Sequence, residues 1–181
     1  MTFFLLGCIG GLSDKWVIGE DPTDTAVPLV DTAPSSDVDC DEDLAEVLET
    51  CFTGTLTCGD RLLATNAGAA QLYTDAFYES AYCFVPYESY IGPERVWEIE
   101  FDGAHQAEVV LAAPCEDMAL AVARWEPTDT CPPEEGHQIL ECEGREASAG
   151  GRVTLSSPSG ARYLVMVDGP EANFELWVEC S

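Results

Sequence analysis

Short apolar runs separated by turn residues make up most of the chain after residue 54. In the segment 96–101, Trp97, Ile99 and Phe101 fall on one side of an extended backbone, and mostly polar residues fall on the other. The segment 173–178 has the same period of two, which is typical of strands with one buried face. Strands are predicted in this way at 54–58, 71–73, 81–85, 96–101, 107–111, 118–125, 138–142, 152–155, 162–167 and 173–178.

The residues between these runs indicate the fold class. Gly, Pro, Asp and Ser punctuate the chain and favour tight turns, notably at 91–93, 101–103, 150–151, 159–160 and 168–170. Many short strands at regular spacing are typical of all-β sandwiches and barrels. We therefore expect residues 39–181 to form one all-β domain, a β-sandwich.

A short helix is predicted at the start of this domain. Its apolar residues follow the i, i+3, i+4, i+7 spacing of one helix face, and they are Leu44, Val47, Leu48 and Cys51. Asp39 can cap this helix, and the acids at 41–43 suit the positive end of its dipole. The alternative is a calcium loop counted from Asp39. An EF-hand would need Gly at position 44 and Glu at position 50, where the chain has Leu and Thr.

The first eight residues resemble the end of a bacterial lipoprotein signal. Leu5-Leu6-Gly7-Cys8 has the aliphatic and small residues of a lipobox, in which the cysteine becomes the lipidated N-terminus. Residues 1–7 lack a basic region and are short for an apolar core, so we interpret 1–8 as a truncated signal with its lipobox. The alternative is an apolar N-terminus in which Cys8 is a free thiol.

Residues 9–38 are predicted to form a disordered acidic linker. They mix Pro, Thr, Ser and Asp without a sustained apolar period, so they cannot bury enough surface to offset the entropy of ordering. The pairs Asp24-Thr25 and Asp31-Thr32 resemble spacers behind the lipobox cysteine in surface lipoproteins of myxobacteria and their relatives. No later segment has the roughly 18 continuous apolar residues of a membrane span. Membrane attachment is therefore expected through the N-terminal lipid alone.

The charge of the chain restricts its partners. There are 34 acidic and 7 basic residues, which gives a net charge of −27. Such a surface repels phosphate backbones and anionic lipid headgroups, so we expect no binding to nucleic acid. It would attract Ca²⁺ or cationic partners, although acidity also serves simply to keep a protein soluble.

The nine cysteines favour an oxidising compartment. They are spread along the chain rather than grouped as two CxxC pairs, which argues against a structural zinc site. If Cys8 is lipidated, eight cysteines remain, an even number that suits disulfides. These are Cys40, Cys51, Cys58, Cys83, Cys115, Cys131, Cys142 and Cys180. Proximity in sequence favours the pairs Cys40–Cys51, Cys58–Cys83 and Cys131–Cys142, with Cys115 and Cys180 left over, but many other pairings are open.

Three segments are similar to bacterial pre-peptidase C-terminal (PPC) domains. GPERVWEIEF (92–101) resembles their entry strand, VVLAAPCEDMALAVARW (109–125) a central pair of strands, and SGARYLVMVDGPEANFELWVEC (159–180) their closing hairpin. The resemblance implies a small, jelly-roll-like β-sandwich. It also implies the roles of such domains in secreted proteases, which are to aid secretion, bind insoluble substrates or hold structural Ca²⁺.

Calcium is the cofactor that this resemblance suggests. The second Asp of the family's Asp-Leu-Asp-Leu motif falls on Ala119, which leaves Asp117 alone. Asp102 and Asp168 are the other candidate ligands, but each precedes Gly, where Asp is a normal turn former. Asp102, Asp117 and Asp168 are therefore the metal-site hypothesis, and no other cofactor is indicated.

Recognised catalytic signatures are absent from the sequence. The two histidines, His105 and His137, do not lie in an HExxH motif, and no GxSxG elbow is present. The four Trp and six Tyr raise the hypothesis of a carbohydrate-binding platform. Its candidates are Trp125, at a strand end, and Trp177, which points away from Phe174 and is expected to be exposed.

These observations favour a non-enzymatic lipoprotein of the cell envelope, facing the periplasm or the exterior. It would present a disulfide-bonded β-sandwich for binding or envelope structure. The alternative is a secreted accessory module that binds calcium, carbohydrate or protein. A hydrolase without a recognised motif is the third hypothesis. The expected partners are the membrane, through the lipid alone, and an extracellular glycan or protein.

Overall fold

The chain forms nine strands and one helix among the residues that this computed structural model describes. Those residues are 36–44, 51–81, 92–103, 106–126, 131–132, 141–146, 150–155, 157 and 160–181, without the side chains of 79–81 and 141–150. They all fall within one compact unit, Thr32–Ser181. The predicted lipobox and nearly all of the predicted linker 9–38 lie outside the described residues.

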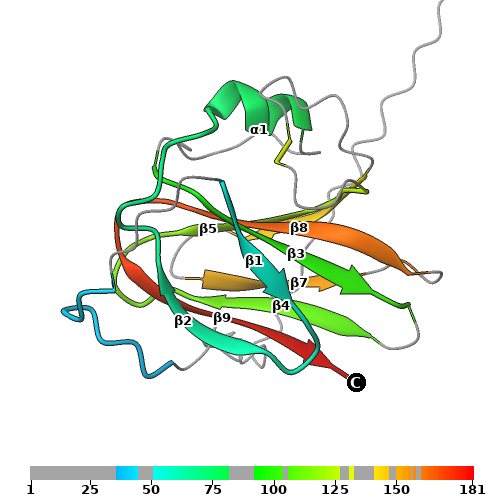
Figure 1. Ribbon diagram of the computed structural model, residues 1–181, viewed down its shortest axis with the longest axis horizontal. Helices are drawn as coiled ribbons and strands as arrows, with labels where there is room; N and C mark the ends of the chain where they lie inside the picture. Colours follow the sequence, from blue (N-terminus) through cyan, green and yellow to red (C-terminus); the bar gives the residue numbers. More distant parts are fainter. Residues whose placement is uncertain are drawn as a thin grey trace, which may run out of the picture. The chain divides into compact units, whose positions relative to one another are not determined.

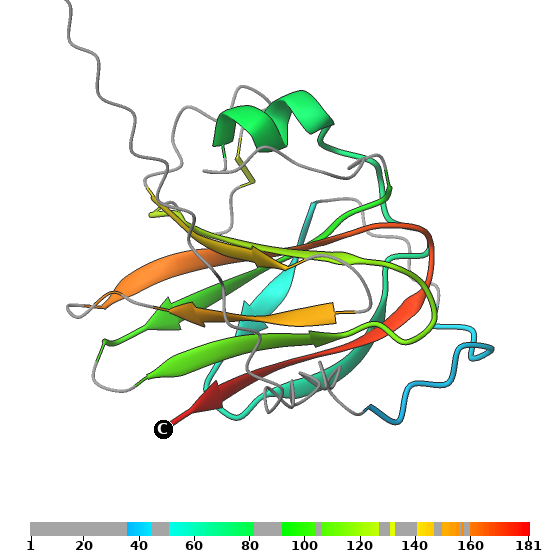
Figure 2. The same cartoon turned by 180° about the vertical axis from the view of Figure 1, so that it is seen from behind.

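The strands confirm the all-β fold class. They are β1 (Phe52–Leu56), β2 (Arg61–Thr65), β3 (Arg95–Phe101), β4 (Ala107–Ala112), β5 (Ala119–Arg124), β6 (Glu141–Glu146), β7 (Gly150–Leu155), β8 (Ala161–Asp168) and β9 (Asn173–Cys180), and the helix is α1 (Asp75–Ala81). Two sheets have the orders β1-β3-β8-β5-β6 and β2-β9-β4-β7. Strand β1 runs parallel to β3, and the other pairs are antiparallel. Figure 1 and Figure 2 show the two sheets as stacked layers.

One strand prediction is wrong, because residues 71–73 are irregular. Of the predicted strand 81–85, only Ala81 is described, and it ends α1, while 82–85 lie outside the described residues. The sequence analysis predicts neither β2 nor α1. The helix has only seven residues, DAFYESA, which is two turns and too short for a clear 3.6-residue period. Its place is set by packing instead.

The main core lies between the two sheets. Trp97, Ile99 and Phe101 of β3 point into it, as the alternation predicts, and they meet Phe174 and Leu176 of β9. The Trp97 and Phe174 rings make an edge-to-face contact with centroids 6.0 Å apart. Each of these five side chains is at most 5% exposed, and such burial stabilises the fold by roughly 1.5–3 kcal/mol per large apolar residue.

A second apolar cluster covers the outer surface of the five-stranded sheet. Tyr73, Phe77 and Tyr78 pack there against apolar side chains of β3, β5 and β8 and against Trp125. The rings of Tyr73 and Phe77 stack with centroids 4.0 Å apart. Figure 1 and Figure 2 show α1 above this sheet, on the side away from β4 and β9. Among the described residues, no helix is long and apolar enough to cross a membrane.

The predicted N-terminal helix is not seen where the chain is described. Residues 39–44 form turns and irregular structure, and 45–50 lie outside the described residues. Asp39 accepts a hydrogen bond from the Asp41 amide at 3.0 Å, so it stabilises a local turn. The Asn173 side chain then donates to the carbonyls of Asp39 at 2.8 Å and Glu42 at 2.7 Å. This tertiary contact orients the segment against the start of β9.

The disulfides differ from the pairs favoured by proximity in sequence. The described bridges are Cys40–Cys115, Cys51–Cys131 and Cys58–Cys180, with Cα–Cα distances of 5.5, 6.3 and 5.6 Å. The three local pairs are therefore wrong. Sheet formation brings together residues 75 to 122 positions apart, and this spatial proximity decides the pairing. Cys83 and the side chain of Cys142 lie outside the described residues.

Asn66 joins three loops at one end of the sandwich. It is fully buried, and its amide nitrogen donates to the carbonyls of Pro93 at 3.1 Å, Gly169 at 2.8 Å and Pro170 at 3.0 Å. Its amide oxygen accepts from the Ala172 N–H at 2.8 Å. A buried amide with all these partners fixes the loops without leaving unsatisfied polar groups.

Gly92 packs against the same loops. A Cβ at position 92 would lie 1.9 Å from the carbonyl oxygen of Gly169, closer than any real contact. We predict that Gly92→Ala lowers the free energy of unfolding by about 3 kcal/mol, because backbone must move to make room. Gly54→Ala is the matched control, since its Cβ would lie 3.8 Å from Trp97, and we expect a change below about 1 kcal/mol. Chemical denaturation of both variants measures this, and equal midpoints would contradict the packing.

Removal of the bridge with the longest sequence separation tests the disulfide pattern. We predict that replacing Cys58 and Cys180 together by Ser lowers the free energy of unfolding by about 4 kcal/mol, because the bridge closes the longest described loop, with a sequence separation of 122 residues. Peptide mapping without reduction should recover Cys40 linked to Cys115 and Cys51 linked to Cys131 in this variant. Recovery of a Cys40–Cys51 peptide would contradict the described pairing.

Candidate functional site

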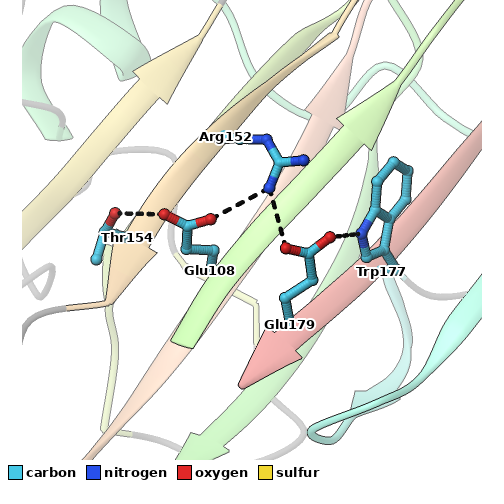
Figure 3. A network of polar contacts seen from close by, with 5 residues as sticks. All are labelled: Glu108, Arg152, Thr154, Trp177 and Glu179. Carbon is cyan, nitrogen blue, oxygen red and sulfur yellow. Dashed lines mark hydrogen bonds and ion pairs between the residues drawn. The ribbon is translucent and has the colours of Figure 1, made fainter. Parts of the chain in front are cut away.

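The outer surface of the four-stranded sheet gathers charged side chains from all four of its strands. Alternation directs the core residues inward and leaves the remaining positions outside. We call this surface the β9 face, and its residues are Arg61, Leu63, Glu108, Arg152, Thr154, Glu175, Trp177 and Glu179. Figure 3 shows five of these side chains in one network across β4, β7 and β9.

Trp177 forms the centre of the β9 face and is buried, contrary to the prediction. Its side chain is 6% exposed because it packs against Val110 and Ala112 and lies under Arg61. The guanidinium carbon of Arg61 is 4.6 Å from the centre of the Trp177 ring, a cation–π contact. The indole N–H donates to Glu179 at 2.8 Å.

Arg61 is held over the ring by a bidentate ion pair. Its Nε donates to one oxygen of Glu175, and a terminal nitrogen donates to the other oxygen at 2.7 Å. The Arg61 side chain is 51% exposed, whereas that of Glu175 is 14% exposed. The pair therefore fixes the direction of an accessible cation, and fork-to-fork geometry makes this orientation specific.

Arg152 connects two acids on neighbouring strands. One guanidinium nitrogen lies 3.2 Å from Glu108 and 3.1 Å from Glu179, and the Thr154 hydroxyl donates to Glu108 at 3.4 Å. All three charged side chains are more than a third exposed, so these pairs add little stability. Hydrogen bonds from Trp177 and Arg152 lower the pKa of Glu179, and Glu179 and Glu108 raise the pKa of Arg152.

The β9 face presents accessible polar and apolar groups beside two shallow hollows. Shallow hollows lie on either side of Glu179, one beside Asp60 and Arg61 and the other beside Gln106 and Thr154. Leu63, at 44% exposed, is the large hydrophobic residue that is exposed in the described part of the chain. An accessible arginine above a buried tryptophan is a combination of the residue types that are enriched at the centre of protein interfaces.

A separate polar group lies at the end of β3 and β8, below α1. Glu94 and Asp168 are 1% and 2% exposed, which is unusual for two carboxyl groups. Glu94 accepts from the amides of Leu72 at 2.6 Å and Tyr73 at 3.0 Å. Asp168 accepts from the Gly92 amide at 3.3 Å through Oδ1, and its buried Oδ2 has no hydrogen-bond partner among the described residues.

Burial dominates the protonation of this pair. Loss of hydration raises the pKa of Glu94 to about 8, and the charge of Asp168 raises it further against the opposing backbone hydrogen bonds. Burial likewise raises the pKa of Asp168 to about 6, while contacts with Tyr78, Gly92 and Glu94 favour its charged form. Two buried carboxylates cannot both be charged at low cost, so the pair holds a proton that a solvated pair would release.

The structure does not bring the predicted calcium ligands together. Asp168 is the last residue of β8, whereas Asp102 follows β3 next to the first residue of β8. Asp102 and Asp168 therefore lie at opposite ends of β8. Asp117 is exposed in the loop before β5, whereas Asp168 is buried beside Glu94. No group of three or more His, Cys, Asp or Glu in metal-binding proximity occurs among the described residues.

The tryptophan platform is also not formed. Trp125 is 1% exposed because it packs with Tyr73 and Phe77 on the five-stranded sheet, and Trp177 belongs to the other sheet. Cys8, His105 and His137 lie outside the described residues. The sequence analysis did not single out Arg61, Glu94 or Glu175. The one signal available for Glu94 was its place two residues before Val96, on the same side of the strand.

The titration of Glu179 tests the β9 face. We predict that Trp177→Phe and Arg152→Met each raise the pKa of Glu179, because each removes a donor that stabilises its charged form. Arg124→Met is the matched control, since Arg124 pairs with Glu126 on the other sheet and should leave the pKa of Glu179 unchanged. Carboxyl-detected NMR titration measures all three variants. An equal shift in the Arg124 variant would contradict a local network.

Comparisons with known proteins leave the family open. No family model matches the chain, and no curated protein matches it. Among solved structures, it is similar to PliG from Aeromonas hydrophila, a periplasmic inhibitor of g-type lysozyme. The two sequences are 13% identical, the match covers 72% of this chain and 99% of PliG, and the TM-score is 0.38. Likeness at this level carries no argument about function.

Proposed function

We propose that the chain is a non-enzymatic binding module of the cell envelope, whose β9 face binds a protein. In this proposal a lipid on Cys8 attaches it to a membrane, and residues 9–38 act as the spacer. The observation that carries the binding role is the oriented Arg61 above Trp177, flanked by Leu63. The net charge of −27 favours a cationic partner by long-range attraction.

The disulfides support the proposed compartment. Three bridges are described, and such bonds form and persist outside the cytoplasm in most bacteria. The likeness to PPC domains also stays part of the proposal, as a sandwich displayed outside the cell. A calcium-binding role has no support from the described positions of Asp102, Asp117 and Asp168.

The proposed anchor is tested by the mass of the mature protein. We expect expression from the native upstream region, in a bacterium that processes lipoproteins, to give a chain that begins at Cys8 and carries a diacyl or triacyl mass. Alkylation should reach the other cysteines only after reduction. Cys8→Ser is the control and should release the chain from the membrane fraction. An unmodified protein with free thiols in the cytoplasm would contradict both anchor and compartment.

The binding face is tested by site-specific photo-crosslinking in cells. We expect p-benzoylphenylalanine in place of Leu63 to form an adduct with another protein, and Arg61→Ala to reduce that adduct about tenfold or more. The same probe in place of Glu126 is the matched control, because Glu126 is exposed but follows β5 in the other sheet. Equal adducts from positions 63 and 126, or no effect of Arg61→Ala, would contradict a binding role for this face.

A further inference from the structure

The carboxyl pair Glu94 and Asp168 lies directly across two neighbouring strands. The last paired residues of β3 and β8 are Arg95 and Val167, so Glu94 and Asp168 form the next pair outward. They share the sheet surface of Val96 and Met166, because residues two apart on a strand point the same way. This is the surface that α1 covers, since Val96 and Met166 belong to the cluster beneath it.

The pair is joined to the segment 70–78, which leads into and includes the first part of α1. Glu94 accepts from the Leu72 and Tyr73 amides, and its own amide donates to the Ala70 carbonyl at 3.2 Å. Tyr78 of α1 favours the charged form of Asp168. Three backbone hydrogen bonds that hold this segment on the sheet therefore meet at Glu94. The Tyr73 hydroxyl adds a separate contact, which it donates to the Pro132 carbonyl at 3.0 Å.

In the described part of the chain, the titratable groups that act on this pair include Tyr73, Asp75 and Tyr78 of the covering segment, and the negative charge of Asp75 disfavours ionisation of Asp168. On the neighbouring strand β5, the residue opposite Asp168 is the uncharged Ala119. The adjacent Arg95 instead donates to the carbonyls of Thr65 at 2.8 Å and Ala67 at 3.2 Å.

We propose that Glu94 and Asp168 share one proton, and that this proton is a latch that holds the segment 70–78 on the five-stranded sheet and loosens as the pH rises. With the proton present, Glu94 and Asp168 hydrogen-bond to each other while Glu94 still accepts from Leu72 and Tyr73. Without it, two adjacent negative charges lie in a buried site. Opening the segment hydrates both charges and relieves their repulsion.

The direction of the pH dependence follows from the raised pKa values. An open segment releases the proton near the ordinary carboxyl range, whereas the closed segment keeps it until the pH reaches about 6 to 8. Between these limits the closed state binds more protons, so opening becomes more favourable as pH rises and levels off above about 8. The latch is thus firmest in acid, the opposite of a carboxylate held in a salt bridge. This device goes beyond the proposed binding role and does not rest on it.

Hydrogen exchange of the full chain, followed by mass spectrometry from pH 5 to pH 8, tests the latch. After correction for intrinsic exchange, we expect peptides covering 70–78 to lose protection about tenfold or more relative to peptides covering β9. Glu94→Gln should remove this loss, because a neutral amide can accept from Leu72 and donate to Asp168 at every pH. Asp168→Asn should also remove this pH-dependent loss of protection. It replaces Glu94→Gln in the experiment if that variant does not fold.

Glu100→Gln is the matched control. Glu100 lies on β3, on the same side as Glu94, but is exposed, so this variant should show the wild-type pH dependence. The proposal is overturned if wild-type protection of 70–78 does not fall relative to β9. It is also overturned if the fall persists unchanged in both Glu94→Gln and Asp168→Asn.

Discussion

The position of the N-terminal part of the domain depends on three covalent bonds. Each described disulfide has one cysteine between residues 40 and 58 and the other in the C-terminal part of the chain. Cys51 precedes β1 directly, and Cys58 follows it by two residues, so both ends of β1 are fixed. This matters because β1 is the edge of its sheet and pairs with β3 alone among the described strands. Its Leu56 is nevertheless 1% exposed in the core.

The two sheets use their outer surfaces differently. The part of the five-stranded sheet that α1 covers carries small and apolar side chains outside, while Glu98, Glu100 and Arg162 lie on the same side of that sheet. The four-stranded sheet carries arginines and glutamates outside, with Trp177 buried among them. Part of one outer surface is thus covered by the chain itself, whereas the other keeps Arg61, Glu108, Arg152 and Glu179 accessible. That difference is the physical basis for assigning binding to the β9 face.

An acidic chain with few cations must stabilise its carboxylates in several ways. Of the arginines whose side chains are described, four make ion pairs with Glu, and Arg95 donates to the Thr65 and Ala67 carbonyls. Glu98 and Arg162 pair at 2.9 Å where Glu98 is nearly buried. Some carboxylates therefore pair with the few arginines. At Glu94 and Asp168 a shared proton reduces the charge in place of an arginine.

Local features of this protein follow from patterns within short segments of the sequence. Alternation of side chains identified most strands and the inward direction of Trp97 and Phe174, because a period of two depends only on the backbone of the same strand. The number of cysteines also indicated an oxidising compartment. It could not identify α1, whose seven residues acquire a helical place by packing on the sheet.

Only the tertiary structure decided the disulfide pairing, the burial of Trp125 and Trp177, and the meeting of Glu94 with Asp168. These outcomes depend on which strands become neighbours. Glu94 and Asp168 are far apart in the chain, yet the antiparallel register of β3 and β8 places them opposite each other. No pattern within either segment specifies that register. The charge, the cysteine number and most strands could therefore be predicted from the sequence. The sites could not, because they depend on contacts between residues that are far apart in the chain.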